Sequence, residues 1–347
     1  RLAECDASRP PDTAALLTPE LWLLFLQATV KQSMEKIDRI RRIVGTLLQN
    51  VVCSDRIPGD LPHKALLRSI IERCMDEQKI DWSAPGRTFP LLVPALLPLP
   101  EFVSPVVEGL VLSVGGLSMH VVRAASSSFI GTLKEWQKSG VDADASALAV
   151  TIQTLIDVFR RHAQEDRVIM PLLGTFDQLL THQLLPLEPA LQLMNCIRDE
   201  CNNAPKKDVS KFLSIITVVC GLLSLPAEID PARPLRTACL QFLLVLLGNR
   251  FPKVRARTGQ QLYTALLTFG ENFGDVDDDS MDEVLETLLN GHWDGTDAVA
   301  VRSKRDSLYP LLRLAKPTTK PTVAAKPKPR TAVEEESYAS LVKDAGY

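Results

Sequence analysis

An acidic segment between residues 275 and 286 has the residue types, and part of the spacing, of a calcium-binding loop. Oxygen-bearing side chains occupy the first, third, fifth, ninth and twelfth positions of that frame: Asp275, Asp277, Asp279, Glu283 and Glu286. The sixth position, which needs glycine for a sharp turn, is Ser280, and the eighth, usually apolar, is Asp282. These mismatches favour an acidic loop followed by a helix that Ser280 and Glu283 cap.

The cysteines and histidines form no recognised motif of metal binding or nucleophilic catalysis. Cys196 and Cys201 are five residues apart, and no second Cys or His pair follows at zinc-finger spacing. The seven cysteines are scattered, mostly in apolar stretches, as reduced core thiols of a cytosolic protein would be: Cys5, Cys53, Cys74, Cys196, Cys201, Cys220 and Cys239. The five histidines contain no HExxH pattern: His63, His120, His162, His182 and His292. We predict that the protein is not an enzyme and uses no metal or cofactor; a hydrolase or metal protein whose groups converge in space is the alternative.

A short basic cluster is the best candidate for contact with a partner protein. Arg250, Lys253, Arg255 and Arg257 surround Pro252, which favours the start of a helix, and Tyr263 follows nearby. Such a cluster suits an acidic partner surface, whereas a solvated face or pairing between repeats is the alternative reading. Residues 271–294 contain nine acidic residues and no Lys or Arg, so attraction within the chain competes with partner binding.

Helices must position these groups, because apolar residues recur at helical spacing almost throughout the sequence. Strand-like alternation is nearly absent, and only 5% of the residues are aromatic. In the second half, helices are predicted to begin near residues 144, 166, 187, 208, 233, 253, 280 and 297, so successive pairs lie about 45 residues apart. This period predicts an all-α fold, a HEAT/armadillo-type helical-repeat solenoid, whose stacked hairpins leave a surface for partners.

The net charge and the length of the apolar runs limit the classes of partner that the sequence suggests. The formal net charge is −3, so no global basic field indicates nucleic acid. The longest nearly uncharged apolar run, residues 212–225, is shorter than the roughly 20 residues of a membrane span. The sequence begins at Arg1 without a Met or a signal sequence, and we expect it to be a piece of a longer protein.

Composition divides the chain into five segments. Residues 1–17 are an N-terminal extension, 18–82 a helical region, 83–105 a connector with six prolines that is predicted to be irregular, and 106–314 the C-terminal HEAT-like repeats. Within the repeats, residues 109–123 predict a helix, a Gly-Gly turn and a second helix. Residues 315–347 are predicted to be a disordered, basic, proline-rich tail whose cations form an electrostatic tether: Lys316, Lys320, Lys326, Lys328 and Arg330.

Several segments resemble the tubulin-folding cofactor D family. The run GLVLSVGGLSMHVVR at residues 109–123 and the run LLGNRFPKVRARTGQQLYTALLTF at residues 246–269 carry most of the resemblance, and the second is the more telling. Shorter similarities lie at residues 35–39, 81–85 and 171–177. Together these segments span most of residues 18–314. The resemblance implies the C-terminal third of a HEAT/armadillo-type protein of the tubulin assembly pathway.

The resemblance also implies a function and partners. In that family the cofactor accepts β-tubulin, associates with cofactors C and E and a small Arf-like GTPase, and with them promotes GTP hydrolysis on tubulin. It implies β-tubulin or αβ-tubulin as the partner, and a cytoplasmic protein of the microtubule cytoskeleton or centrosome. No catalytic motif carries over, so the basic cluster, Tyr263 and the tail cations are the candidate partner-binding residues. A helical-repeat scaffold or transport adaptor with a different protein cargo is the alternative.

Overall fold

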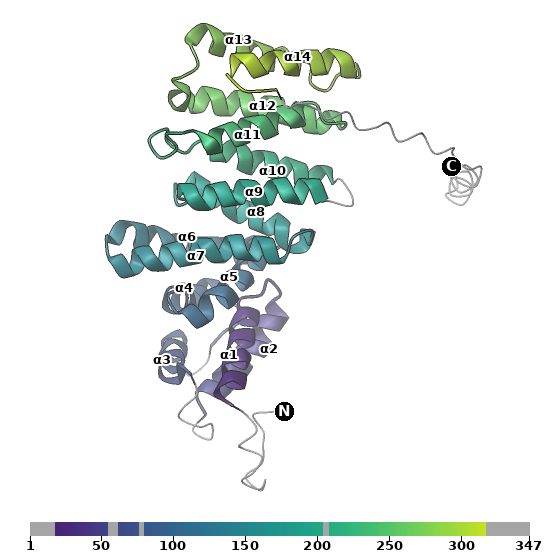
Figure 1. Cartoon of the computed structure of the whole chain (residues 1–347). Coiled ribbons are helices and arrows are strands. Elements are labelled where there is room, and N and C mark those ends of the chain that lie inside the picture. Colours follow the sequence, from purple (N-terminus) through teal and green to yellow (C-terminus); the bar gives the residue numbers. More distant parts are fainter. Residues whose placement is uncertain (1–17, 55–61, 76–79, 204–207, 317–347) are drawn as a thin grey trace, which may run out of the picture. The chain divides into compact units, whose positions relative to one another are not determined.

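The computed structural model describes residues 18–54, 62–75, 80–203 and 208–316 (Figure 1). These residues form fourteen α-helices, one short 3-10 helix and no strand. The helices are α1 (Pro19–Ser33), α2 (Asp38–Val52), α3 (Lys64–Cys74), α4 (Pro85–Leu96), α5 (Pro100–Val114), α6 (Met119–Ser139), α7 (Asp142–Arg161), α8 (Asp166–Thr181), α9 (Leu187–Asn203), α10 (Val209–Leu222), α11 (Pro234–Leu247), α12 (Pro252–Thr268), η2 (Gly270–Phe273), α13 (Asp278–Leu289) and α14 (Ala298–Leu311). The predicted all-α class is confirmed, whereas the predicted N-terminal extension and almost all of the predicted tail lie outside the described residues.

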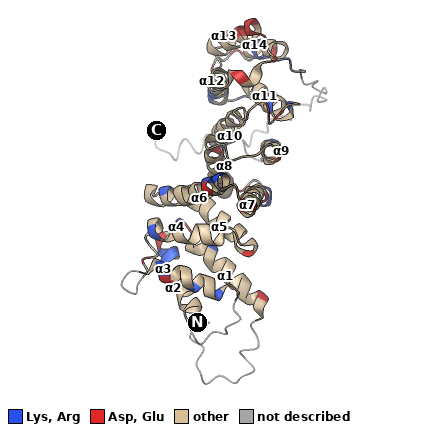
Figure 2. Ribbon diagram, turned by 90° about the vertical axis from the view of Figure 1, so that its left-hand side faces the viewer, with Lys and Arg blue, Asp and Glu red and all other residues tan. Residues whose placement is uncertain are grey.

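From α7 onward the helices pair, and each helix from α7 to α10 packs on the helix two positions further along the chain. Helices α8, α10 and α12 form one layer and α7, α9 and α11 a second, as the turned view in Figure 2 shows. Helix α13 then packs on α12, and α14 on α11. The helices from α7 to α14 begin within two residues of the predicted starts, and the pairs repeat about every 45 residues. The stack is the predicted helical-repeat solenoid.

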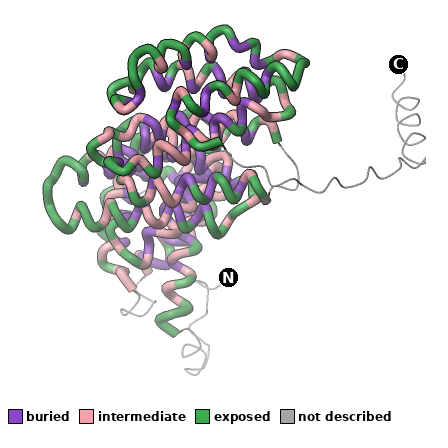
Figure 3. Tube along the Cα trace, turned by 45° about the horizontal axis from the view of Figure 1, so that its top comes forward, coloured by how far each residue is buried: buried purple, intermediate pink, exposed green. Residues whose placement is uncertain are grey.

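A continuous apolar core runs through the stack, where neighbouring helices face each other (Figure 3). Leu48, Phe102, Phe176 and Leu243 are examples from separate parts of the chain, and each has 0% exposed surface. No hairpin buries its apolar face alone, so each depends on the next pair for the removal of that surface from water.

The proline-rich residues 83–105 are largely helical, and the prediction of an irregular connector there is wrong. Pro85 and Pro100 occupy the first turns of α4 and α5, where a missing N–H costs no helical hydrogen bond. Pro90, Pro94 and Pro105 lie inside the helices on exposed or half-buried sides. The opposite side of α4 is buried, and this packing outweighs the lost hydrogen bonds: Phe89, Leu92, Val93 and Leu96. The predicted Gly-Gly turn is confirmed between α5 and α6, while the domain boundary at residue 105 stays a prediction.

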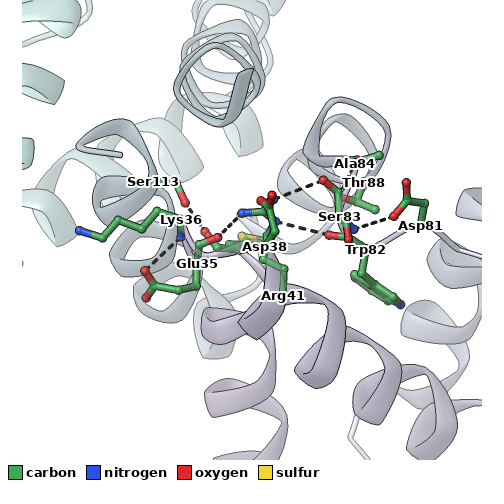
Figure 4. Close-up of polar contacts among 11 residues, drawn as sticks. Glu35, Lys36, Asp38, Arg41, Asp81, Trp82, Ser83, Ala84, Thr88 and Ser113 are labelled. Carbon is green, nitrogen blue, oxygen red and sulfur yellow. Dashed lines mark hydrogen bonds and ion pairs between the residues drawn. The ribbon is translucent and has the colours of Figure 1, made fainter. Parts of the chain in front are cut away.

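A buried arginine ties the start of α2 to the segment that precedes α4 (Figure 4). Arg41 has 0% exposed surface, and its Nη1 donates to the Glu35 carbonyl oxygen at 2.6 Å. Its Nε and Nη2 donate to the carbonyl oxygens of Trp82 and Ser83, both at 3.4 Å. Gly45, one turn further along α2, faces the Trp82 ring, and a Cβ there would lie only 2.1 Å from Trp82 Cδ2.

The same arrangement recurs in α12. Arg255 is 7% exposed, and its Nη1 donates to the Asn249 carbonyl oxygen at 2.8 Å. Its Nε donates to the Trp293 carbonyl oxygen at 2.7 Å and its Nη2 to that of Gly295 at 2.5 Å. A Cβ at Gly259 would lie 2.5 Å from Trp293 Cδ1.

We call this contact the Arg–Gly–Trp clamp. The first clamp is Arg41, Gly45 and Trp82, and the second is Arg255, Gly259 and Trp293. In each, the arginine binds a carbonyl six residues before it and the carbonyl of the tryptophan, while the glycine one turn later admits the indole ring. The clamp supplies hydrogen bonds to carbonyls that no helix ladder satisfies.

Glu108 of α5 joins two other helices through charge. Its carboxylate pairs with Lys31 of α1 and Arg161 of α7, and it accepts a hydrogen bond from Ser104 Oγ at 3.3 Å. Burial raises the pKa of this carboxyl, but the hydrogen bond and charge of Lys31, together with Arg161, outweigh it and hold the pKa below its ordinary value of 4.5. The ionised form therefore stabilises the fold.

Replacing a clamp glycine by alanine should change the free energy of unfolding in the opposite direction to the same replacement at an unconstrained helical glycine. Gly45→Ala and Gly259→Ala should each destabilise the protein by about 1–3 kcal/mol, because the added methyl overlaps the indole ring. Gly174→Ala in α8 is the matched control: nothing lies within 4 Å of its Cβ position, so alanine should stabilise by about 0.5–1 kcal/mol. Urea unfolding followed by circular dichroism measures all three. A clamp variant as stable as Gly174→Ala would refute the packing argument.

The contribution of Glu108 to the stability of the protein should depend on pH. Because its folded pKa is lowered, its contribution is complete above the unfolded pKa near 4.5 and is lost as the pH falls through the folded pKa. Glu108→Gln should therefore be less stable than the natural protein at pH 7, and the gap should shrink as the pH falls below about 4.5. Urea midpoints at pH 7, 5, 4 and 3 test this, and a gap that stays constant would contradict it.

Candidate partner-binding site

The predicted basic residues lie at the start of α12, but they do not all face solvent. Arg250 and Lys253 are exposed, Arg257 and Tyr263 are half-buried, and Arg255 is buried. The turn before α12 is fixed by Asn249, whose side-chain oxygen accepts from the Phe251 N–H at 2.9 Å. The Arg250 guanidinium lies over the Phe251 ring, 4.5 Å from its centroid, so the exposed cation is held against an apolar surface.

Arg255 acts inside the fold. Its guanidinium donates to the carbonyl oxygens of Asn249, Trp293 and Gly295, with a longer contact to that of Arg250 at 3.4 Å. These acceptors use the planar fork of the side chain and leave it buried. Arg255 therefore has a structural role, whereas the other cations of the cluster remain exposed or half-buried.

A groove of about 420 Å³ opens between the turn before α12 and the start of α14. Its ten lining residues include three arginines and no Asp or Glu: Gly248, Asn249, Arg250, Pro252, Arg255, Gly295, Thr296, Ala298, Val301 and Arg302. Arg302 is exposed on α14 and faces the groove from the side opposite Arg250. Sequence reasoning missed Arg302, because it lies about 50 residues beyond the cluster and only the packing of α14 on α11 brings it there.

The start of α14, and with it the position of Arg302, is fixed by a helix cap. The Asp297 side chain accepts from the N–H groups of Val299 at 2.9 Å and Ala300 at 3.1 Å. A carboxylate at this position also complements the positive end of the helix dipole. The Asp-Ala-Val pattern indicates the start of this helix in the sequence, but it does not indicate the groove.

The acidic segment at residues 271–294 is engaged with other arginines. Asp275 Oδ2 accepts from Arg236 Nη2 at 2.7 Å and pairs with Arg233; burial raises the pKa of Asp275, but these arginines outweigh it and lower the pKa below its ordinary value. Asp277 caps α13 by accepting from the Ser280 N–H at 2.9 Å, so the helix cap is Asp277 and not Ser280 as predicted. The last nine positions of the calcium-loop frame lie in α13, and no group of three metal-ligating side chains converges among the residues described.

The cysteines occupy apolar surroundings, as predicted for core thiols. Cys196, Cys220 and Cys239 are buried, and Cys53, Cys74 and Cys201 are half-buried against the apolar core. Burial raises the pKa of Cys220 to about 12, and it raises the pKa of Cys239 as well. Because the thiolate is the reactive form, these two side chains are chemically inert at neutral pH.

The predicted tail cations extend beyond the described part of the chain. Lys316 is described and exposed. The remaining four lie outside the described residues: Lys320, Lys326, Lys328 and Arg330. No helix in the described ranges is both long enough and apolar enough to cross a membrane.

The paired stacking of helices and the open basic groove define a helical-repeat scaffold of the HEAT type. Residues 24–211 match the family described as tubulin folding cofactor D C terminal. The chain belongs to this family, as the resemblance implied. The match includes the run at residues 109–123 and ends before the run at residues 246–269, which carried the stronger resemblance.

A curated relative matches over a longer stretch of the chain. The chain is 25% identical over 343 residues to the tubulin-specific chaperone D of Dictyostelium discoideum. That alignment covers 92% of this chain and 22% of the relative, so the chain spans about a fifth of the relative's length. No solved structure matches.

Because Arg255 is buried and Arg250 is exposed, replacing each by alanine should change stability by different amounts. Arg255→Ala should destabilise the protein by about 2–4 kcal/mol, because several buried carbonyl oxygens lose their donor. Arg250→Ala, on the exposed surface, should stay within about 0.5 kcal/mol of the natural protein. Urea unfolding of the two variants measures the difference. Equal stability losses would remove the assignment of Arg255 as a structural residue.

Proposed function

We propose that this chain holds β-tubulin, alone or within the αβ heterodimer, by non-covalent contacts while other proteins act on it. The observation that carries the proposal is the family match over residues 24–211, supported by the relative named a tubulin-specific chaperone. Stacked helical pairs suit this role, because they present an extended surface without requiring a catalytic pocket. The proposal includes association with cofactors C and E and a small Arf-like GTPase, and with them the promotion of GTP hydrolysis on tubulin.

The charge on the described surface supports an acidic partner at one place. Figure 2 shows basic and acidic residues on many of the helices, whereas Arg250, Lys253 and Arg257 lie together in and just before the first turns of α12. Tubulin presents an acidic surface with more acidic tails, so this cluster and the tail cations together would attract it. The contribution of each exposed pair is about 1 kcal/mol or less, and salt weakens it.

The proposal assigns no covalent step to this chain. The neutral, buried thiols of Cys220 and Cys239 support a binding role, since neither is available as a nucleophile. Any GTP hydrolysis would occur on tubulin, with this chain holding one of the reacting proteins in position.

Direct binding to purified αβ-tubulin tests the proposal. The full chain should bind in a fluorescence or calorimetric titration, with an affinity that falls between about 50 mM and about 300 mM salt. A full-length variant with Gln at residues 316, 320, 326, 328 and 330 should bind more weakly at low salt and show a smaller salt dependence, with an unchanged melting temperature. Absence of binding at low salt, or capture of a different cytosolic protein in preference to tubulin, would contradict the proposal.

A further inference from the structure

The groove between α12 and α14 has the chemistry of a peptide-binding site. Arg250 and Arg302 stand on opposite sides of it, and Pro252, Ala298 and Val301 provide apolar contacts between them. Gly248 and Gly295 also line the groove, and the Arg305 guanidinium lies against Gly248, where a Cβ would be only 2.5 Å from Arg305 Nη1. A volume of about 420 Å³ accommodates a few residues of an extended peptide.

The two exposed arginines carry uncompensated charge. Within the described ranges, neither Arg250 nor Arg302 forms an ion pair, whereas the neighbouring Arg305 is paired with Asp306. The Arg250 guanidinium lies over the Phe251 ring, which orders the side chain, and the residue remains exposed. The charge on both sides of the groove is therefore available to an incoming anion.

The second clamp fixes both sides of the groove before any partner arrives. Arg255 lies in the lining and binds the carbonyl oxygen of Asn249 on the α12 side. Through its other nitrogens it binds the carbonyl oxygens of Trp293 and Gly295 on the α14 side. A site held in this way loses little conformational entropy when a ligand binds.

We propose that this groove binds an acidic peptide segment of a partner protein, with one carboxylate on Arg250 and a second on Arg302. The arginine fork matches a carboxylate through two parallel N–H···O bonds, and the apolar lining suits the intervening peptide. The groove offers two exposed arginines and is flanked by the exposed Asp294 and Asp297, so it suits a short segment with two carboxylates better than a long polyanion such as a nucleic acid. The inference rests on the proposed function only for the identity of the partner, since tubulin would supply the acidic segment.

The test compares a double charge reversal with a matched control. The full chain is titrated with a fluorescein-labelled peptide of six glutamates flanked by glycines, and separately with purified αβ-tubulin. Arg250→Glu/Arg302→Glu should weaken peptide binding by about tenfold or more, because two attractive contacts become repulsive. The control Arg167→Glu/Arg198→Glu makes the same charge change on exposed positions of α8 and α9 and should alter peptide affinity by less than about twofold.

The outcomes separate this inference from the proposed function. Loss of peptide binding in the groove variant alone supports the inference, with or without tubulin binding. Tubulin binding by the natural chain, together with no peptide binding or with equal losses in both variants, overturns the inference and leaves the proposed function intact. Peptide binding without tubulin binding supports the groove and refutes the proposed function. Tighter binding of a single-stranded oligonucleotide of equal charge than of the peptide would also overturn the inference.

Discussion

An arginine buried among backbone carbonyls is the contact on which the order of the helices depends, first in α2 and again in α12. The turn before a helix leaves carbonyl oxygens that no helical ladder satisfies, and the segment that returns from a later helix brings more of them into the interior. One guanidinium meets both needs, because its fork can donate to two backbone segments at once. The glycine one turn later then sets how closely the tryptophan ring of the returning segment can pack.

The clamp explains how the side chains of Arg41 and Arg255 are accommodated inside an apolar array. An isolated buried cation would be very costly, but each guanidinium here is surrounded by carbonyl dipoles and makes several hydrogen bonds. Arg41 of the first clamp also pairs with Asp38, while Arg255 of the second donates to carbonyl oxygens. Arg255 of the second clamp also lines the groove, together with the exposed Arg250 and Arg302. A structural residue and the residues proposed to bind a partner are thus neighbours around one groove.

Charge bridges complement this packing elsewhere in the array. Glu108 connects α1, α5 and α7, and the buried Glu200 accepts from Lys211 Nζ at 2.7 Å while also binding the Gln164 N–H at 2.9 Å. Glu108 thus links helices that are distant in sequence, while Glu200 links α9 to the next helix and to the turn before α8. Because removal of one partner leaves a charge in a partly buried place, these pairs specify which helices meet as well as adding to stability.

The sequence alone determined the helical class, the repeat length and most helix starts, because apolar spacing, proline at first turns and capping residues act locally. It also determined family membership through residues that lie in the matched range. The sequence-based prediction of an irregular connector at residues 83–105 was wrong. Local rules include the cost of a proline inside a helix, but they omit the core contacts that Phe89 and Leu92 gain when the helix forms. For the binding site the sequence located the basic cluster, but it could not tell buried Arg255 from exposed Arg250, nor bring Arg302 to the same groove. Those choices depend on which carbonyls and helices arrive from elsewhere in the chain, and only the tertiary structure decided them.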